Sequence, residues 1–332
     1  MPSVRRPVGG ALLLLLLLGA AAAAGLLLGA ANVSPSEVWG ALSGRDVDPS
    51  ARTIVVSLRL PRVVAAALTG IALAISGTLF QALLRNPLAE PYLLGVSSGA
   101  ALGAVLALTV FGGALGPLGT ASFALVGALV AIAVVFRVAL GVGRLDTHVL
   151  ILAGVVVAAF FGAGVMLLLS LAEADATRSA ILWTMGSLER AGWESTVTLA
   201  VAALGGGALS YGLSRHLNAL ALGEEAAAYL GARVELIKRT AYLIASLLAA
   251  VAVSTAGVIG FVGLVVPHGA RMLWGSDHRR LLPLGALGGA VALVVADTVA
   301  RTALRPLELP VGVVTALLGV PLFLVLLKRT HA

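Results

Sequence analysis

The segment VGGALLLLLLLGAAAAAGLLLGAA, residues 8–31, decides the class of fold. It holds no charged side chain, and about 20 apolar residues are enough for a helix to cross a bilayer. Arg5 and Arg6 precede it, as in a secretory signal. A signal has a shorter apolar core of roughly 7–15 residues. We therefore expect this segment to be retained as a first membrane span.

The whole chain has the composition of a membrane protein. Of its 332 residues, 60% are hydrophobic and only 11% are charged, with a mean hydropathy of +1.06. A soluble domain is about 25% charged, because charged side chains cover its surface. This deficit excludes an ordinary cytoplasmic enzyme, a disordered tail and a nucleic-acid module. The net charge of +7 is better explained by basic loops that set orientation in the bilayer.

Reading the apolar runs between charge clusters predicts an all-α polytopic protein with about ten transmembrane helices. The eighth run is too short to cross unbroken, so we expect a broken or half-depth element there. A single transmembrane domain would fill residues 1–332. The runs are 8–31, 61–84, 92–111, 118–141, 148–171, 193–214, 240–260, 262–274, 281–303 and 310–328.

The basic residues predict the orientation. With ten spans and a cytoplasmic N-terminus, 14 of the 22 lysines and arginines lie inside. Eight arginines lie outside: Arg45, Arg52, Arg59, Arg62, Arg178, Arg190, Arg301 and Arg305. Basic residues are enriched in cytoplasmic loops, so both termini are expected in the cytoplasm. The outer arginines are numerous enough to need a separate reason.

The two halves of the chain echo each other weakly. Gly77, Pro87 and Gly95 recur 180 residues later as Gly257, Pro267 and Gly275. In a ten-span topology the copies, about 57–171 and 237–328, start from opposite sides. This pattern indicates an inverted repeat, a common device of transporters. Separately, a glycine every four residues at 95, 99 and 103 predicts close helix packing.

Several kinds of chemistry find no support in the sequence. There is no cysteine, and no two of the five histidines have the i, i+4 spacing of a helical zinc site. Neither lysine follows a glycine, so the chain lacks a phosphate-binding loop. We expect no metal site, no catalytic residue and no bound cofactor. If ATP drives this protein, ATP and Mg bind on another chain.

Two polar features stand out. Residues 215–239 form the most polar stretch on the cytoplasmic side, and Gly223 and Gly231 bracket about two helical turns that begin with two glutamates. It is either a plain connector or a knob that fits a groove on a cytoplasmic partner. Asp297 and Arg301 lie one turn apart near the outer end of the ninth run, which favours a structural ion pair.

An ordered series of motifs resembles the FecCD permeases, the membrane subunits of importers for iron–siderophore, haem and cobalamin. The resemblance runs from about residue 35 to the C-terminus. The motifs are Arg59-Leu-Pro-Arg62, Ser76-Gly-Thr-Leu-Phe-Gln81, Arg85-Asn-Pro-Leu-Ala-Glu-Pro91, Leu94-Gly-Val-Ser-Ser-Gly-Ala-Ala101, Leu220-Ala-Leu-Gly-Glu224, Gly260-Phe-Val-Gly-Leu-Val-Val-Pro-His268, Asp277-His-Arg279, Ala296-Asp-Thr-Val-Ala-Arg301, Glu308-Leu-Pro-Val-Gly312 and Leu318-Gly-Val-Pro-Leu-Phe323.

The resemblance implies a type II importer permease fold and a set of partners. These are a second copy of the chain, two cytoplasmic ATP-binding-cassette subunits and an extracytoplasmic solute-binding protein. The host membrane would be the bacterial or archaeal cytoplasmic (inner) membrane. The chain itself would not be an enzyme.

The same resemblance assigns roles to residues. Arg59, Arg62 and Arg301 would receive glutamates of the binding protein, which would explain the excess of outer arginines. The 222–231 stretch would couple to the ATPase, and the inner gates would be formed at 86–88 and 147–148. The coupling residues are Leu222, Gly223, Glu224, Glu225, Tyr229 and Gly231, and the gate residues are Asn86, Leu88, Thr147 and His148. For His148, a plain interfacial histidine is an equal alternative.

The expected mechanism is alternating access. ATP binding would shift the coupling helices and rearrange the fifth spans at the dimer axis. Small and apolar side chains of residues 150–186, including Trp183 and Met185, would line a weakly binding path. The expected cargo is iron–siderophore first, with cobalamin or haem next. The alternatives are an ion-coupled secondary transporter that uses Asp297 and a membrane scaffold or channel.

Overall fold

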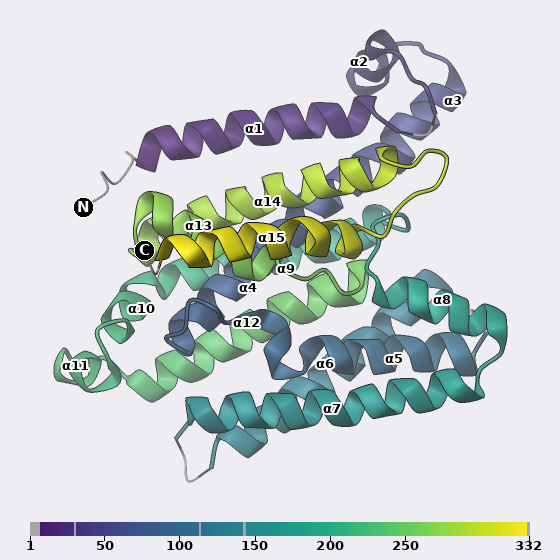
Figure 1. Ribbon diagram of the computed structural model, residues 1–332. Coiled ribbons are helices and arrows are strands. Elements are labelled where there is room, and N and C mark those ends of the chain that lie inside the picture. The colour runs from purple at the N-terminus through teal and green to yellow at the C-terminus, as the bar shows by residue number, and fades with distance from the viewer. Residues whose placement is uncertain (1–6, 30, 113, 142–143, 331–332) are drawn as a thin grey trace.

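The computed structural model describes residues 7–29, 31–112, 114–141 and 144–330. Within these ranges the chain is helical and has no strand apart from one isolated bridge between Leu304 and Leu307. The long helices lie side by side along one direction (Figure 1). Arg5 and Arg6, counted in the orientation argument, lie outside the described residues.

Each of the ten predicted apolar runs coincides with a helix. Six helices are long and apolar enough to cross a membrane: α1 (Pro7–Leu27), α4 (Leu60–Leu83), α6 (Gly116–Ala139), α7 (Thr147–Leu171), α12 (Val234–Ala256) and α14 (His278–Thr302). A seventh span is the pair α9 (Trp193–Gly212) and α10 (Ser214–Leu220), bent by 56°. The shorter apolar helices are α5 (Val96–Val110), α13 (Val262–Trp274) and α15 (Val311–Thr330). At 13 residues, α13 is too short to cross unbroken, as expected.

The helices define two ends of the molecule. The first, called the α8 end, holds α8 (Ala174–Thr184), the start of α4 and the end of α14 (Figure 1). The second, called the α11 end, holds α11 (Glu224–Tyr229), the end of α4 and the start of α14. All eight arginines predicted to share one side lie within or next to elements of the α8 end. The remaining described lysines and arginines lie in or next to elements of the α11 end, so the two predicted groups of basic residues lie at opposite ends of the molecule. That the α11 end is the cytoplasmic one stays a prediction.

The helix order repeats. In the first half α4, α5, α6 and α7 have 24, 15, 24 and 25 residues. In the second half α12, α13, α14 and α15 have 23, 13, 25 and 20. The first series starts at the α8 end and the second at the α11 end, as in an inverted repeat (Figure 1). The residue echo is looser, since Gly77 lies inside α4 whereas Gly257 ends α12.

Short helices that the apolar runs did not predict lie at the α8 end. They are α2 (Pro35–Ser43), α3 (Pro49–Arg52), the π-helical turn η1 (Thr53–Arg59) and α8. The segment η1 runs without a break into α4, so this helix starts well before the predicted residue 61. The Leu60 amide donates to the Val55 carbonyl, a π-type bond that keeps the helix continuous up to Pro61, which has no amide hydrogen to give.

The core depends on glycines that let backbones touch. A Cβ at Gly99 would overlap the Gly127 carbonyl, and one at Gly103 would overlap the Phe123 carbonyl, both on α6. The predicted packing role is therefore confirmed for Gly99 and Gly103 on α5, whereas Gly95 caps the helix with φ +78°. Gly77 on α4 approaches the Gly263 carbonyl of α13 in the same way. Because lipid tails are as apolar as leucine, close van der Waals contact of this kind holds membrane helices together.

Candidate functional site: two polar ends joined by the helix bundle

A buried charge cluster occupies the α8 end. Asp297 on α14 is 1% exposed and lies between two guanidinium groups. Its Oδ1 and Oδ2 accept from Arg62 Nε at 3.0 and 3.2 Å, and Oδ2 lies 3.1 Å from Arg301 Nε. Arg62 also binds Glu308 at 2.8 Å through Nη1. Four alternating charges thus join α4, α14 and the loop before α15.

Arg59 has a different set of partners. Its Nη1 donates to the carbonyls of Leu26 and Leu27 at 2.7 and 3.0 Å, and its Nη2 donates to the Ala31 carbonyl. These groups include carbonyls left free by the end of α1, which a cation stabilises well. Because carbonyls carry no net charge, the positive charge of Arg59 is not neutralised by these bonds.

The structure therefore brings the three arginines of the predicted binding-protein pocket to one end, but it buries them. Arg59, Arg62 and Arg301 are 5, 9 and 4% exposed. Arg62 and Arg301 are engaged with carboxylates, and Arg59 with backbone. Their docking role stays a prediction.

The Asp297–Arg301 pair is confirmed, and its surroundings bear on the ion-coupled alternative. Both carboxylate oxygens of Asp297 are occupied by guanidinium groups. A transported cation would have to displace two buried arginines to reach this carboxylate. The geometry thus favours a structural role for Asp297.

At the α11 end, the predicted two-turn helix is confirmed as α11. Apolar side chains on both sides of this helix face outward: Leu222, just before it, and Leu230, just after it, are each 69% exposed, and Tyr229 at its end is 93% exposed. Glu225 is exposed too, whereas the Glu224 side chain is 38% exposed and contacts Lys238. Gly223 takes φ +114° and Gly231 φ +79°, conformations that favour glycine at both edges of the helix.

Glu224 is held by a lysine that sequence reasoning did not single out. Lys238 on α12 has a side chain only 4% exposed, and its Nζ lies 3.1 Å from Glu224 and 3.3 Å from Glu235. One signal was available in the sequence, since Lys238 is one of only two lysines and lies in the polar stretch 215–239. A buried lysine needs carboxylate partners.

The first predicted gate segment is a tight turn after α4. The Leu88 amide donates to Asn86 Oδ1 at 2.9 Å, and Leu88 is exposed. Arg85 takes a left-handed backbone with φ 47°. Its guanidinium lies beside the coupling element, because a Cβ added at Gly223 would be 3.9 Å from Arg85 Nη1.

The second predicted gate segment starts α7. Asp146 caps this helix by accepting from the His148 and Val149 amides at 2.8 and 3.1 Å. The bonds from Val149 and His148 lower the pKa of the Asp146 carboxyl. His148 is exposed and Thr147 half-buried. The gate roles of Thr147, His148, Asn86 and Leu88 stay predictions.

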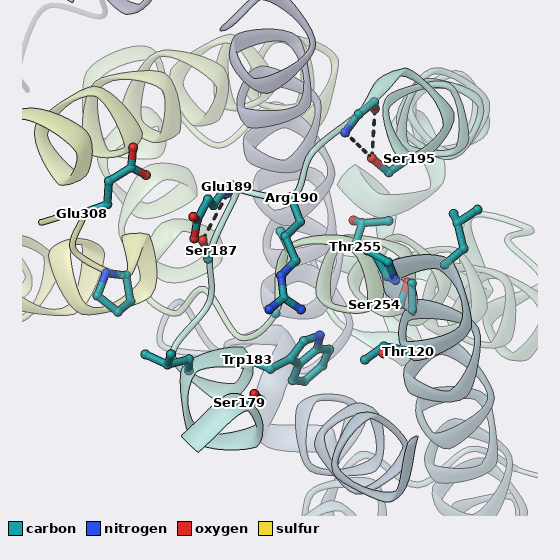
Figure 2. A pocket seen from close by; sticks show the side chains of 18 of the residues that line it. Thr120, Ser179, Trp183, Ser187, Glu189, Arg190, Ser195, Ser254, Thr255 and Glu308 are labelled. Carbon is teal, nitrogen blue, oxygen red and sulfur yellow. Dashed lines mark hydrogen bonds between the residues drawn. The ribbon is translucent and has the colours of Figure 1, made fainter. Parts of the chain in front are cut away.

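A cavity of 690 Å³ opens at the α8 end. Figure 2 shows Trp183 and Arg190 near the centre of the cavity, with Ser254, Thr255 and Thr120 to their right. Trp183 therefore lines a cavity, whereas Met185 is not among its lining residues. The predicted path also includes α7, none of whose residues lines this cavity; on this helix Val156, Phe160 and Met166 are 67, 72 and 74% exposed. An apolar face of this kind faces lipid or another protein chain.

Metal binding has no support in the described residues, where no three histidine, aspartate or glutamate side chains come together as a ligand group. The polar clusters at both ends are ion pairs between helices. They hold the bundle and its loops together, and Glu308 of the cluster at the α8 end also lines the cavity. The described residues thus define an all-helical, multi-pass membrane protein.

Comparisons with known proteins agree. The chain belongs to the FecCD transport family, whose model matches residues 13–329. It is 44% identical to the cobalamin import system permease protein BtuC of Halobacterium salinarum over 85% of this chain and 75% of the relative. It is 42% identical to the hemin transport system permease protein HmuU of Yersinia pestis, over 92% of each chain.

A solved structure supports the fold. An ABC transporter of metal-chelate type, in an inward-facing conformation, superposes with a TM-score of 0.86 at 33% identity. The match covers 96% of this chain and 98% of that one. The protein is thus a transport subunit of the cytoplasmic membrane, and the family's permeases are not themselves catalytic.

Proposed function

We propose that this chain is the permease subunit of an ATP-driven importer that carries a metal chelate into the cytoplasm by alternating access. The observation that carries the proposal is the FecCD match over residues 13–329. The functional unit would be two copies of the chain, two ATP-binding-cassette subunits and a solute-binding protein. Chemistry on the cargo is not required, since the chain only provides a path.

The distribution of charge supports an orientation with the α11 end in the cytoplasm. Basic residues are enriched on the cytoplasmic side of membrane proteins. Both termini would then be cytoplasmic. The cassette subunits would meet the α11 end, and the binding protein would dock at the α8 end, above the cavity lined by Trp183.

For the ATPase, α11 provides the contact. An exposed tyrosine with exposed leucines before and after its short helix has the composition of an interface centre. Glu224 and Gly223 would hold this surface in place, and Glu225 and Gly231 would border it. The proposed gate segments 86–88 and 147–148 lie at the same end of the molecule. A displacement of α11 would therefore have to be transmitted over only a short distance to reach them.

The cargo is proposed at the level of a class. The relatives named above carry cobalamin and haem, and all of these cargoes are chelates with a large organic shell. Iron–siderophore remains our first expectation, with cobalamin or haem next. Mostly small and apolar lining along α7, with Trp183 and Met185 near its outer end, would let such a shell pass without tight binding.

The proposed contact between α11 and the ATPase subunit is tested with the substitution Tyr229→Ala. Loss of a central aromatic anchor weakens an interface by about 2 kcal/mol or more. We therefore expect the variant to co-purify poorly with the cassette subunit while its own stability is unchanged. Trp39→Ala is the matched control, because Trp39 is an aromatic residue 64% exposed on α2 at the opposite end. Equal co-purification of both variants would contradict the proposed contact.

A further inference from the structure

The coupling helix α11 and the start of α7 are joined by a continuous polar path. Both Glu224 carboxylate oxygens lie 3.1 Å from Lys238 Nζ. The same Nζ lies 3.3 Å from Glu235 Oε1. The other oxygen, Glu235 Oε2, accepts from the Leu145 backbone amide at 2.8 Å. Ion pairs and one hydrogen bond thus connect Glu224, Lys238, Glu235 and the Leu145 amide without a gap.

The far end of this path is firmly attached to α7. The Leu145 side chain is fully buried, so the backbone at this point is anchored in the core. The next residue, Asp146, caps α7 and donates its own amide to the Ala139 carbonyl at the end of α6 at 3.2 Å. A displacement of the Leu145 amide therefore displaces the first turn of α7, where Thr147 and His148 lie.

The near end is equally constrained. On the α10 side, Asn218 donates to Asp277 at 2.7 Å and accepts from the His278 amide at 2.9 Å, which ties α10 to the start of α14. On the α12 side, Lys238 holds Glu224. Residues 218–224 are therefore held at both ends, by α14 through Asn218 and by α12 through Glu224. A displacement of α11 would thus move α12 as well.

We infer that Lys238 and Glu235 are positioning residues that transmit movement of α11 to the loop that starts α7. This inference rests on the proposed function, because it assigns the mechanical connection within the same importer. Lys238 is suited to the role because its ammonium is buried between two carboxylates. The carboxylates of Glu224 and Glu235 are 38 and 32% exposed, but the ammonium is only 4% exposed. Breaking these bonds would leave a buried charge without a partner, which is costly, so the three residues move together.

The first experiment needs no partner. Hydrogen exchange of the peptide that covers residues 144–150 is measured on the purified permease in nanodiscs. A hydrogen bond to a charged group is strong enough that its loss in Glu235→Leu should speed exchange of the Leu145 amide at least about tenfold. Arg137→Met is the control, since Arg137 is exposed at the same end and makes no ion pair recorded among the described residues. Unchanged exchange in Glu235→Leu would overturn the path.

The second experiment tests transmission in the assembled complex with its cassette subunit. The chain has no cysteine, so a single Thr147→Cys substitution reports on the gate by maleimide labelling with and without ATP. We expect ATP to change the labelling rate at least about fivefold, the lower end of coupling between distant sites. In Lys238→Met this ATP dependence should vanish while assembly and basal ATPase activity remain, and Lys238→Arg should restore it.

The outcomes separate the inference from the proposed function. A Lys238→Met complex that assembles and still responds to ATP would overturn the transmission role. A variant that no longer binds the ATPase would overturn it as well, because Lys238 would then only support the docking surface. If the unsubstituted chain forms no ATPase complex, the proposed function fails, whereas the exchange experiment still decides whether Glu235 holds the Leu145 amide.

Discussion

Replacing Asp297 by asparagine removes one negative charge from the centre of the buried cluster at the α8 end. The asparagine would keep the shape of the side chain and one carbonyl acceptor. It would leave Arg62 and Arg301, both under 10% exposed, with less opposite charge. Breaking a buried ion pair by removing one partner typically costs about 3–5 kcal/mol.

The partners that Arg62 and Arg301 keep in this variant decide whether the loss of stability lies at the low or the high end of the range. Arg62 keeps Glu308 at 2.8 Å, and Arg301 keeps the Gly25 carbonyl at 3.1 Å. The low end of the range applies, so Asp297→Asn should lower the free energy of unfolding by about 3 kcal/mol. Denaturant unfolding in detergent, followed by the fluorescence of the four tryptophans, measures this quantity.

A control and a double substitution complete this experiment. Asp48→Asn makes the same chemical change at the N-cap of α3, where asparagine serves as well as aspartate, and should stay within about 0.5 kcal/mol of the parent. Combining Asp297→Asn with Arg301→Met should cost clearly less than the sum of the two single effects, because the pair is already broken. An unchanged stability in Asp297→Asn, or fully additive effects, would refute the ion-pair reasoning.

Three further predictions follow from single contacts. Gly77→Val should lower the free energy of unfolding by about 3 kcal/mol or more, because the new side chain would overlap the Gly263 carbonyl. Gly19→Val is the control, since a Cβ at Gly19 meets no atom within 4 Å, and it should leave the stability unchanged. Equal stability of the two variants would contradict the packing. The lowered pKa of the Asp146 carboxyl predicts that the cap it forms is fully present above about pH 4 and is lost as pH falls through the lowered pKa. Amide hydrogen exchange at the start of α7, corrected for intrinsic rates, should therefore speed up at low pH in the parent protein, and this pH dependence should be absent in Asp146→Ala. Arg59→Gln should slow binding-protein association at low salt more than Arg59→Lys does, and equal association rates would argue against steering by this charge.

Much of the fold was predictable because its signals are local. An apolar run of about 20 residues predicts a span without knowledge of its neighbours. The Asp297–Arg301 pair was predictable for the same reason, since one helical turn separates the two residues. The bracketing glycines of α11 likewise mark a short helix in the sequence itself.

The rest depends on contacts that no local pattern encodes. Arg62 meets Asp297 across 235 positions, and Glu235 meets Leu145 across 90. The sequence placed Arg62 with the outer arginines but could not show that it turns inward. Glu235 and Lys238 looked like ordinary loop charges until the fold brought α11, α12 and the start of α7 together. The short helices at the α8 end were missed because polar residues interrupt their apolar pattern.

The central claim is that ATP hydrolysis by a partner drives transport through this chain. The most direct measurement is chelate uptake into proteoliposomes that hold the permease and its cassette subunit, with the binding protein outside. An ATP-driven importer predicts uptake that requires ATP inside and is stimulated by the binding protein. Uptake that instead follows a proton gradient without any ATPase complex, and that fails in a folded Asp297→Asn variant, would contradict it.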